Sequence, residues 1–238
     1  MYSEEFFCPF CSSVCDSYGD HALVCSCKGD RTRRHNAERN GVLYQSLSAG
    51  LTAEIERPGL LPPRIEEEGP AAHEATDAAT RASGRRPADV YIPRWHGGIP
   101  AALDLAISSG LRSDALRASA MDGSSHAKAY AQRKKSFLDT SRQCAEQGLT
   151  FVPMVLEAHG GGWGAEARRV LSTLAHKTAA ITGEMPSVVS ERHAQQLSVL
   201  LQKKNSRAVL CRQPDALAAQ SRWAYDAAAE LRSSVADD

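Results

Sequence analysis

The chain has no apolar run that approaches the length of a membrane span. Its N-terminus, M-Y-S-E-E-F-F, also lacks the basic and apolar regions of a secretory signal. These two absences predict an intracellular protein with no membrane partner, nuclear if the organism is a eukaryote. The formal net charge is zero, which argues against a wholly basic protein that coats nucleic acid. Basic residues are nevertheless concentrated between Lys28 and Arg39, as expected of a segment that contacts phosphate.

Cysteine is abundant only at one end, where five of the seven cysteines fall within the first 27 residues. Without a secretory signal, such clustering predicts a metal site rather than disulfides. A Cys-x2-Cys pair followed by a His-x3-Cys pair suits a closed tetrahedral Zn²⁺ site, whose ligands would be Cys8, Cys11, His21 and Cys25. Cys15 and Cys27 remain spare candidates, and the fourth ligand is either Cys25 or Cys27. The alternative is a cluster of reduced structural thiols.

Two aspartates, Asp89 and Asp104, stand in short β-rich runs, R-P-A-D-V-Y-I and A-A-L-D-L-A-I, on either side of a turn. A central strand rarely tolerates an aspartate, because the charge is left desolvated and unpaired. Two such charges on adjacent strands suggest that they act together. A hard divalent cation, Mg²⁺ or Mn²⁺, would compensate both carboxylates. The hairpin therefore favours a metal-dependent hydrolase of phosphodiesters.

The rest of the chain predicts an α/β domain in the order α-β-β-β-α-β. We expect a helix over 39–49, a strand over 51–57, the two aspartate strands around a hairpin tip at 94–98, a helix over 124–147, a strand over 151–156 and helices over 165–181, 188–212 and 214–233. This order divides the chain into a zinc knuckle with a basic segment (1–35), an α/β domain with a long mobile loop over 60–85 (36–182), and a C-terminal helical extension (183–238).

One lysine, Lys134, interrupts the inward stripe of the helix expected over 124–147. That stripe includes Tyr130, Ala131, Phe137 and Leu138 at helical spacing. Lys134 could extend its ammonium to the edge of the stripe, as long side chains often do. Alternatively, it reaches the carboxylate pair, where it would orient water and offset charge on the phosphorane.

The whole pattern resembles the C-terminal region of site-specific non-LTR retrotransposon proteins, in which a Cys-Cys-His-Cys knuckle precedes a restriction-enzyme-like endonuclease. The motifs that carry the resemblance lie between Cys8 and Ala175 and are C-P-F-C, D-S-Y-G-D-H-A-L-V-C, R-R-H-N, E-R-P-G-L-L-P, R-P-A-D-V, A-L-D-L-A-I and F-V-P-M-V-L-E-A-H-G-G. That group belongs to the PD-(D/E)xK nuclease superfamily. Ala106 stands where a D-x-K motif would place its lysine, but in this group the following helix usually supplies that lysine, in agreement with Lys134.

The resemblance implies roles for further residues. The E-x-P-G-L-L pattern makes Glu56 a third acidic group at the metal, against the alternative of a solvated carboxylate on an edge strand. The R-H-N motif and the arginine before it would contact DNA through Arg33, Arg34, His35 and Asn36, although Asn36 could instead cap the first turn of a helix. The expected partners are duplex DNA and a reverse transcriptase encoded in cis or in trans.

Three functions follow. The first is a Mg²⁺-dependent endonuclease derived from a retrotransposon that nicks duplex DNA, with Asp89, Asp104, Lys134 and Glu56 as its catalytic residues. The second is a DNA-binding remnant of such an element whose catalysis has decayed. The third is a structural zinc-binding protein with an unrelated α/β domain, which would leave the paired aspartates unexplained.

Overall fold

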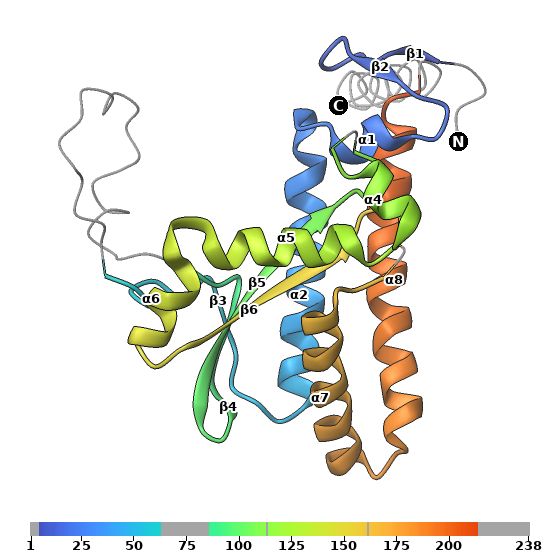
Figure 1. Ribbon diagram of the computed structural model, residues 1–238. Helices are drawn as coiled ribbons and strands as arrows, with labels where there is room; N and C mark the ends of the chain where they lie inside the picture. The colour runs from blue at the N-terminus through green and yellow to red at the C-terminus, as the bar shows by residue number, and fades with distance from the viewer. Residues whose placement is uncertain (1–4, 63–85, 113, 161, 214–238) are drawn as a thin grey trace, which may run out of the picture. The chain divides into compact units, whose positions relative to one another are not determined.

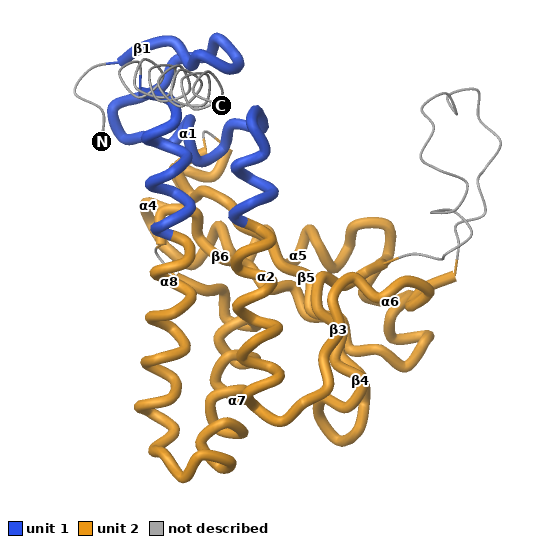
Figure 2. Tube along the Cα trace, turned by 180° about the vertical axis from the view of Figure 1, so that it is seen from behind, with its two compact units in different colours: residues 1–34, 202–238 blue, residues 35–201 orange. Residues whose placement is uncertain are grey.

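The structure is a computed structural model that describes residues 5–62, 86–112, 114–160 and 162–213. They form two compact units: one takes in the described residues of Met1–Arg34 and Gln202–Asp238, and the other those of His35–Leu201 (Figure 2). The helical extension expected from residue 183 is thus divided between the units after Leu201. Most of the predicted loop over 60–85, and the predicted helix over 214–233, lie outside the described residues.

The unit His35–Leu201 is built on a mixed sheet of four strands in the order β3-β4-β5-β6 (Figure 1). The strands are β3 (Glu54–Ile55), β4 (Val90–His96), β5 (Ile99–Ser108) and β6 (Thr150–Glu157). β3, β4 and β5 pair antiparallel, whereas β5 and β6 run parallel and need a crossover between them. Gly97 and Gly98, with φ of 60° and 81°, form the tight turn between β4 and β5.

Helices flank this sheet on both faces. They are α2 (Asp30–Ser48), α4 (Leu116–Met121), α5 (Ser125–Ser136), α6 (Thr140–Glu146), α7 (Ala165–Thr182) and α8 (Pro186–Leu210). α5 lies over one face of the sheet, and α2 and α7 lie over the other (Figures 1 and 2). No helix within the described ranges is long and apolar enough to cross a membrane. The predicted α/β class is confirmed, and the elements follow in the order α2-β3-β4-β5-α4-α5-α6-β6.

Alternating side chains of β5 divide the core in two. Leu103 and Leu105 are buried in the main apolar cluster together with residues of α2 and α7, whereas Ala102 is buried in a second cluster with Cys144 of α6. Successive side chains of a strand point to opposite faces of the sheet, so a strand covered on both faces buries neighbouring residues in different clusters. Asp104 shares the parity of Ala102 and therefore points to the face covered by α5 and α6.

Close packing of α2 explains a glycine in the middle of that helix. A Cβ on Gly41 would lie 2.6 Å from Cδ2 of Leu197 on α8, closer than carbon atoms can approach. A glycine costs about 1 kcal/mol of helix propensity. Here it permits a close helix–helix contact that buries Val42 and Leu197.

The helix expected over 124–147 is interrupted. α5 ends at Ser136, and a short 3-10 turn (Phe137–Asp139) separates it from α6, with Leu138 and Asp139 in the left-handed region. Phe137 and Leu138 are consequently 64% and 45% exposed, so their predicted place in the inward stripe is wrong. The spacing of apolar residues does not reveal a helix break that is caused by positive φ angles, as at Leu138 and Asp139.

Two other boundaries also differ from prediction. α2 begins at Asp30 rather than near Arg39, so Asn36 lies inside the helix and does not cap its first turn. The strand expected over 51–57 is reduced to β3, because Glu56 has a φ of 46° and leaves the extended conformation. The short helix α4 was not predicted.

The other unit is small and rich in turns. Its described elements are β1 (Phe6–Phe7), β2 (Val14–Cys15), α1 (Asp20–Val24), a 3-10 turn (Cys27–Gly29), the first residues of α2 and the last turns of α8. β1 and β2 pair antiparallel around a turn closed by hydrogen bonds between Cys8 and the backbone of Ser12 and Ser13. Among its described residues, Cys8, Cys15 and Cys25 form a buried cluster with a few apolar neighbours, and Ala22, Leu23 and Ala208 are also buried. The described part of this unit thus buries little apolar surface, as is usual for a small unit.

Candidate functional site

The two predicted aspartates meet beside the middle of the sheet. Asp104 lies within β5, and Asp89 is the residue immediately before β4, with its amide donating to the carbonyl of Leu103 at 2.9 Å. Oδ2 of Asp89 accepts the amide of Leu105 at 2.6 Å. The backbone of β5 therefore holds the Asp89 carboxylate next to Asp104.

Lys134 joins this pair from α5. Its ammonium donates to both carboxylate oxygens of Asp104 at 2.8 Å. The side chains of Asp104 and Lys134 are only 20% and 26% exposed, so their charges are weakly screened by solvent. The structure therefore shows Lys134 in contact with the Asp104 carboxylate, and not extended to the edge of the apolar stripe.

The charges at this site do not balance while His35 is neutral. Burial raises the pKa of Asp104, Lys134 opposes this shift and the neighbouring Asp89 adds to it, and the resulting pKa is about 6. The two partly buried carboxylates face one ammonium, that of Lys134, and the imidazole of His35, which adds positive charge only when it is protonated. A bound divalent cation would add further positive charge, and carboxylate oxygens are the ligands that Mg²⁺ and Mn²⁺ prefer. Asp89 and Asp104 offer oxygens of this kind, but the group of the described residues whose geometry could hold a metal ion is that of Cys8, Cys11, His21 and Cys25.

His35, for which the resemblance implies a contact with DNA, lies at this carboxylate site. Its Nε2 lies 3.2 Å from Oδ2 of Asp89. The hydrogen bond with Asp89 raises the pKa of His35, and burial of the ring opposes this shift. In a helix that begins at Asp30, His35 and Arg39 are four residues apart and lie on one face. The sequence analysis placed the helix start near Arg39, so it did not predict the contact between His35 and Asp89.

Glu56 lies near the site but is bound to arginines. Its amide donates to the carbonyl of Asp89 at 3.1 Å. Its carboxylate forms ion pairs with Arg39 and with Arg86, the latter at 3.8 Å. The predicted role of Glu56 as a third acidic group at a metal stays a prediction. Glu54, its neighbour on β3, pairs with Arg57 at 3.0 Å.

The basic segment does not present all its residues to solvent. Arg34 is only 4% exposed, and its guanidinium donates to Oδ1 of Asn205 at 2.9 Å and to the carbonyl of Leu23. The predicted contact of Arg34 with DNA stays a prediction, and the burial of its donors inside its own unit argues against it. Arg33 is 51% exposed at its side chain and keeps a long ion pair of 3.5 Å with Asp30. Asn36 lies beside His35, its Oδ1 3.5 Å from Nδ1 of the ring.

The predicted zinc ligands form a second candidate site, in the other unit. The ligand atoms of Cys8, Cys11, His21 and Cys25 all lie within 4.8 Å of one another. Sγ of Cys11 lies 3.2 Å from Nε2 of His21 and 3.7 Å from Sγ of Cys25. Three thiolates and an imidazole at these separations could hold a zinc ion.

Local structure fixes this ligand set. The Asp16 carboxylate accepts the amides of Asp20 and His21 at 3.1 and 2.8 Å, which orients the start of α1 and with it the imidazole. Cys25 follows the end of α1 and belongs to the group, whereas Cys15 and Cys27 do not. The geometry thus favours Cys25 over Cys27 as the fourth ligand.

No protein-family model matches this chain, and none of the curated proteins with which it was compared matches it either. The two sites therefore have to be interpreted from their own geometry.

Proposed function

We propose that the chain is a Mg²⁺-dependent endonuclease that nicks duplex DNA, with a core of the PD-(D/E)xK type. The observation that carries this proposal is the contact of Lys134 with both oxygens of Asp104, next to Asp89, on a mixed sheet flanked by helices. The resemblance to the nuclease of non-LTR retrotransposons supports the same function and suggests the origin of the gene. A reverse transcriptase encoded in cis or in trans would then be a partner.

In this proposal, Asp89 and Asp104 hold Mg²⁺ or Mn²⁺. The ion would activate a water molecule and neutralise charge on the scissile phosphate. The amide of Leu105 fixes the Asp89 carboxylate, so little reorganisation is needed when the substrate binds. His35 holds the same oxygen from the helix side.

Lys134 acts on the transition state. Its ammonium is placed to donate to the attacking water or to a phosphate oxygen where negative charge develops. Because it lies on a helix packed against β6, its position is set before DNA arrives. Burial of most of its side chain strengthens this electrostatic effect.

The Cys8, Cys11, His21 and Cys25 group has a different role in the proposal. Bound zinc would stabilise the small unit, whose described residues bury little apolar surface, rather than take part in hydrolysis. The exposed Arg33, which follows this knuckle in the chain, would contact a DNA phosphate.

Conversion of supercoiled plasmid to open circles tests this function. The wild-type protein should nick the plasmid with Mg²⁺ or Mn²⁺ and lose this activity on chelation. Asp104→Asn removes one carboxylate with little change in volume and should abolish nicking. Asp122→Asn is the matched control, because Asp122 is an exposed carboxylate that pairs with Lys128.

Two results would reject the proposal. Equal nicking by the wild type and Asp104→Asn would show that the activity comes from elsewhere. A folded protein that binds plasmid but fails to nick it with either metal would instead be a DNA-binding remnant.

A further inference from the structure

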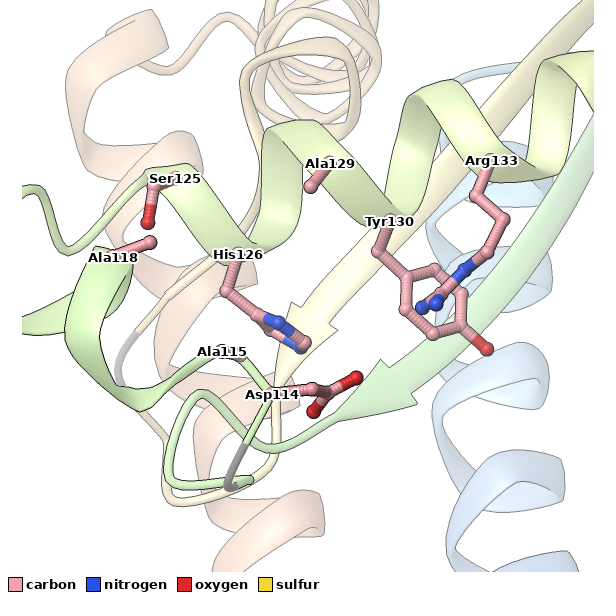
Figure 3. A pocket seen from close by; sticks show the side chains of 8 residues that line it. All are labelled: Asp114, Ala115, Ala118, Ser125, His126, Ala129, Tyr130 and Arg133. Carbon is pink, nitrogen blue, oxygen red and sulfur yellow. The ribbon is translucent and has the colours of Figure 1, made fainter.

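A cavity of about 240 Å³ lies between α4 and α5, on the side of β5 that also carries Asp104. Figure 3 shows the side chains around it, with those of His126, Tyr130 and Arg133 descending from α5. The lining residues are Asp114, Ala115, Ala118, Ser125, His126, Ala129, Tyr130 and Arg133. The proposed nuclease chemistry uses none of them.

Arg133 is the main charge of this cavity. Its guanidinium lies over the Tyr130 ring, 4.6 Å from the ring centroid. Stacking on an aromatic face fixes the plane of a guanidinium and leaves its N–H edge available. Among the described residues, no hydrogen bond or ion pair occupies that edge.

The acidic residue of the cavity is already neutralised. Both oxygens of Asp114 accept hydrogen bonds from Arg112, at 3.0 and 3.2 Å. The Asp114 carboxylate also interacts electrostatically with Arg133, so two guanidinium groups face one carboxylate and leave a net positive charge at the cavity. A cation would be repelled from such a cavity and an anion attracted.

Two further polar groups point to a ligand with oxygen acceptors. Oγ of Ser125 is buried and has no hydrogen-bond partner in the described structure. Nε2 of His126 lies 2.9 Å from Oγ of Ser108. The hydrogen bond with Ser108 therefore occupies Nε2 and not Nδ1 of the ring. The guanidinium of Arg133 is a fork of N–H donors, which can bind two oxygens of a phosphate group at once.

We infer that this cavity binds a phosphate of the DNA strand that the proposed nuclease cleaves, so the inference rests on the proposed function. Arg133 directly precedes Lys134 on α5, so one helix serves both the cavity and the Asp104–Lys134 pair. A phosphate held by Arg133 would therefore belong to a part of the strand close to the one that is cleaved.

Fluorescence anisotropy with short synthetic DNA that has hydroxyl ends tests this site, since every phosphate in that probe is an internal diester. Arg133→Gln should weaken binding about tenfold and lower the salt slope of log K by about 0.9, the value for one lost phosphate contact. Arg133→Lys should keep the slope but recover only part of the affinity, because it loses the planar fork.

Arg117→Gln is the matched control, because Arg117 is an exposed arginine of α4 that does not line the cavity. It should leave affinity and slope unchanged. An equal loss in both variants would reduce Arg133 to a general surface charge and overturn the inference. Inorganic phosphate and a deoxynucleoside monophosphate form the second arm. If either binds through Arg133 while the affinity for DNA does not depend on Arg133, the site serves a free phosphate compound rather than a strand.

Nicking separates this inference from the proposed function. If the wild type does not nick plasmid but its affinity depends on Arg133, the phosphate site stands and the nuclease fails. If the wild type nicks plasmid and Arg133→Gln changes neither affinity nor the KM for nicking, the nuclease stands and the phosphate site fails.

Discussion

The ammonium of Lys134 lies 2.8 Å from each carboxylate oxygen of Asp104, although thirty residues separate the two along the chain. Asp104 comes from a strand of the central sheet and Lys134 from the helix that crosses over it (Figure 1). In the proposed nuclease, this helix supplies the lysine that a D-x-K sequence would place on the strand. Ala106 stands at that strand position and is only 6% exposed.

Replacing Lys134 with alanine should lower the nicking rate on the order of 100-fold, because one preorganised donor to the transition state is lost. Affinity for DNA should change by less than about twofold, since the charge acts on the transition state more than on binding. Single-turnover nicking and anisotropy measure the two effects. Lys128→Ala is the control on the same helix, since Lys128 is exposed and pairs with Asp122. Full activity of Lys134→Ala would mean that the lysine only shields Asp104.

Two adjacent arginines should behave in opposite ways. Arg34→Ala leaves Asn205 and the Leu23 carbonyl without a buried donor and should lower the free energy of unfolding by about 2–4 kcal/mol. Arg33→Ala removes an exposed charge and should leave stability nearly unchanged. Its affinity for DNA should fall and the salt slope should decrease by about 0.9. Urea unfolding and salt titrations separate the pair, and a stable Arg34→Ala protein with weakened DNA binding would reverse our assignment.

His193 should make the stability of the protein sensitive to mild acid. Burial lowers its pKa below the ordinary value of 6.5, and the charge of Arg192 lowers it further, whereas Glu184 opposes this. The unfolded chain therefore binds a proton more readily, so this contribution to stability is complete above pH 6.5 and is lost as the pH falls below it.

Urea unfolding between pH 7.5 and about 5 checks this sign. His193→Gln should flatten the pH dependence, whereas His176→Gln, at an exposed position of α7, should leave it unchanged. Identical curves for the wild type and His193→Gln would contradict the proposed origin of the effect.

Local patterns predicted most of the sheet and the contact of Lys134. The β-rich runs around Asp89 and Asp104 are short-range signals that the structure retains as strands, whereas only the first part of the stripe that includes Tyr130 lies on a helix facing the sheet. The contact follows because a helix between two parallel strands must cross the sheet. None of this required knowledge of distant contacts.

The parts that were missed depend on long-range structure. Arg34 is buried because Asn205, 171 residues later, accepts its hydrogen bond, and no local pattern signals such a partner. The pairing of His35 with Asp89 depends on a helix that begins at Asp30, before the apolar stripe starts. The positive φ of Leu138, which ends α5, is likewise invisible to hydrophobic periodicity.

The zinc site gives the last prediction. The purified protein should contain one zinc ion per chain, and Cys11→Ser should lose it, because the Cys11 thiolate stands between His21 and Cys25. Cys27→Ser is the matched control: it removes a nearby cysteine that lies outside the ligand group. Elemental analysis measures the zinc content of each variant.

Removing zinc should unfold the unit that contains the knuckle while the four-strand sheet persists, because metal binding supplies much of the folding free energy of so small a unit. Hydrogen exchange before and after chelation would show this as lost protection in α1 with protection retained in β5 and β6. Retained protection in α1 after complete removal of zinc would show that the cysteines are structural thiols. Loss of zinc from Cys27→Ser but not from Cys11→Ser would instead show that the ligand set is wrong.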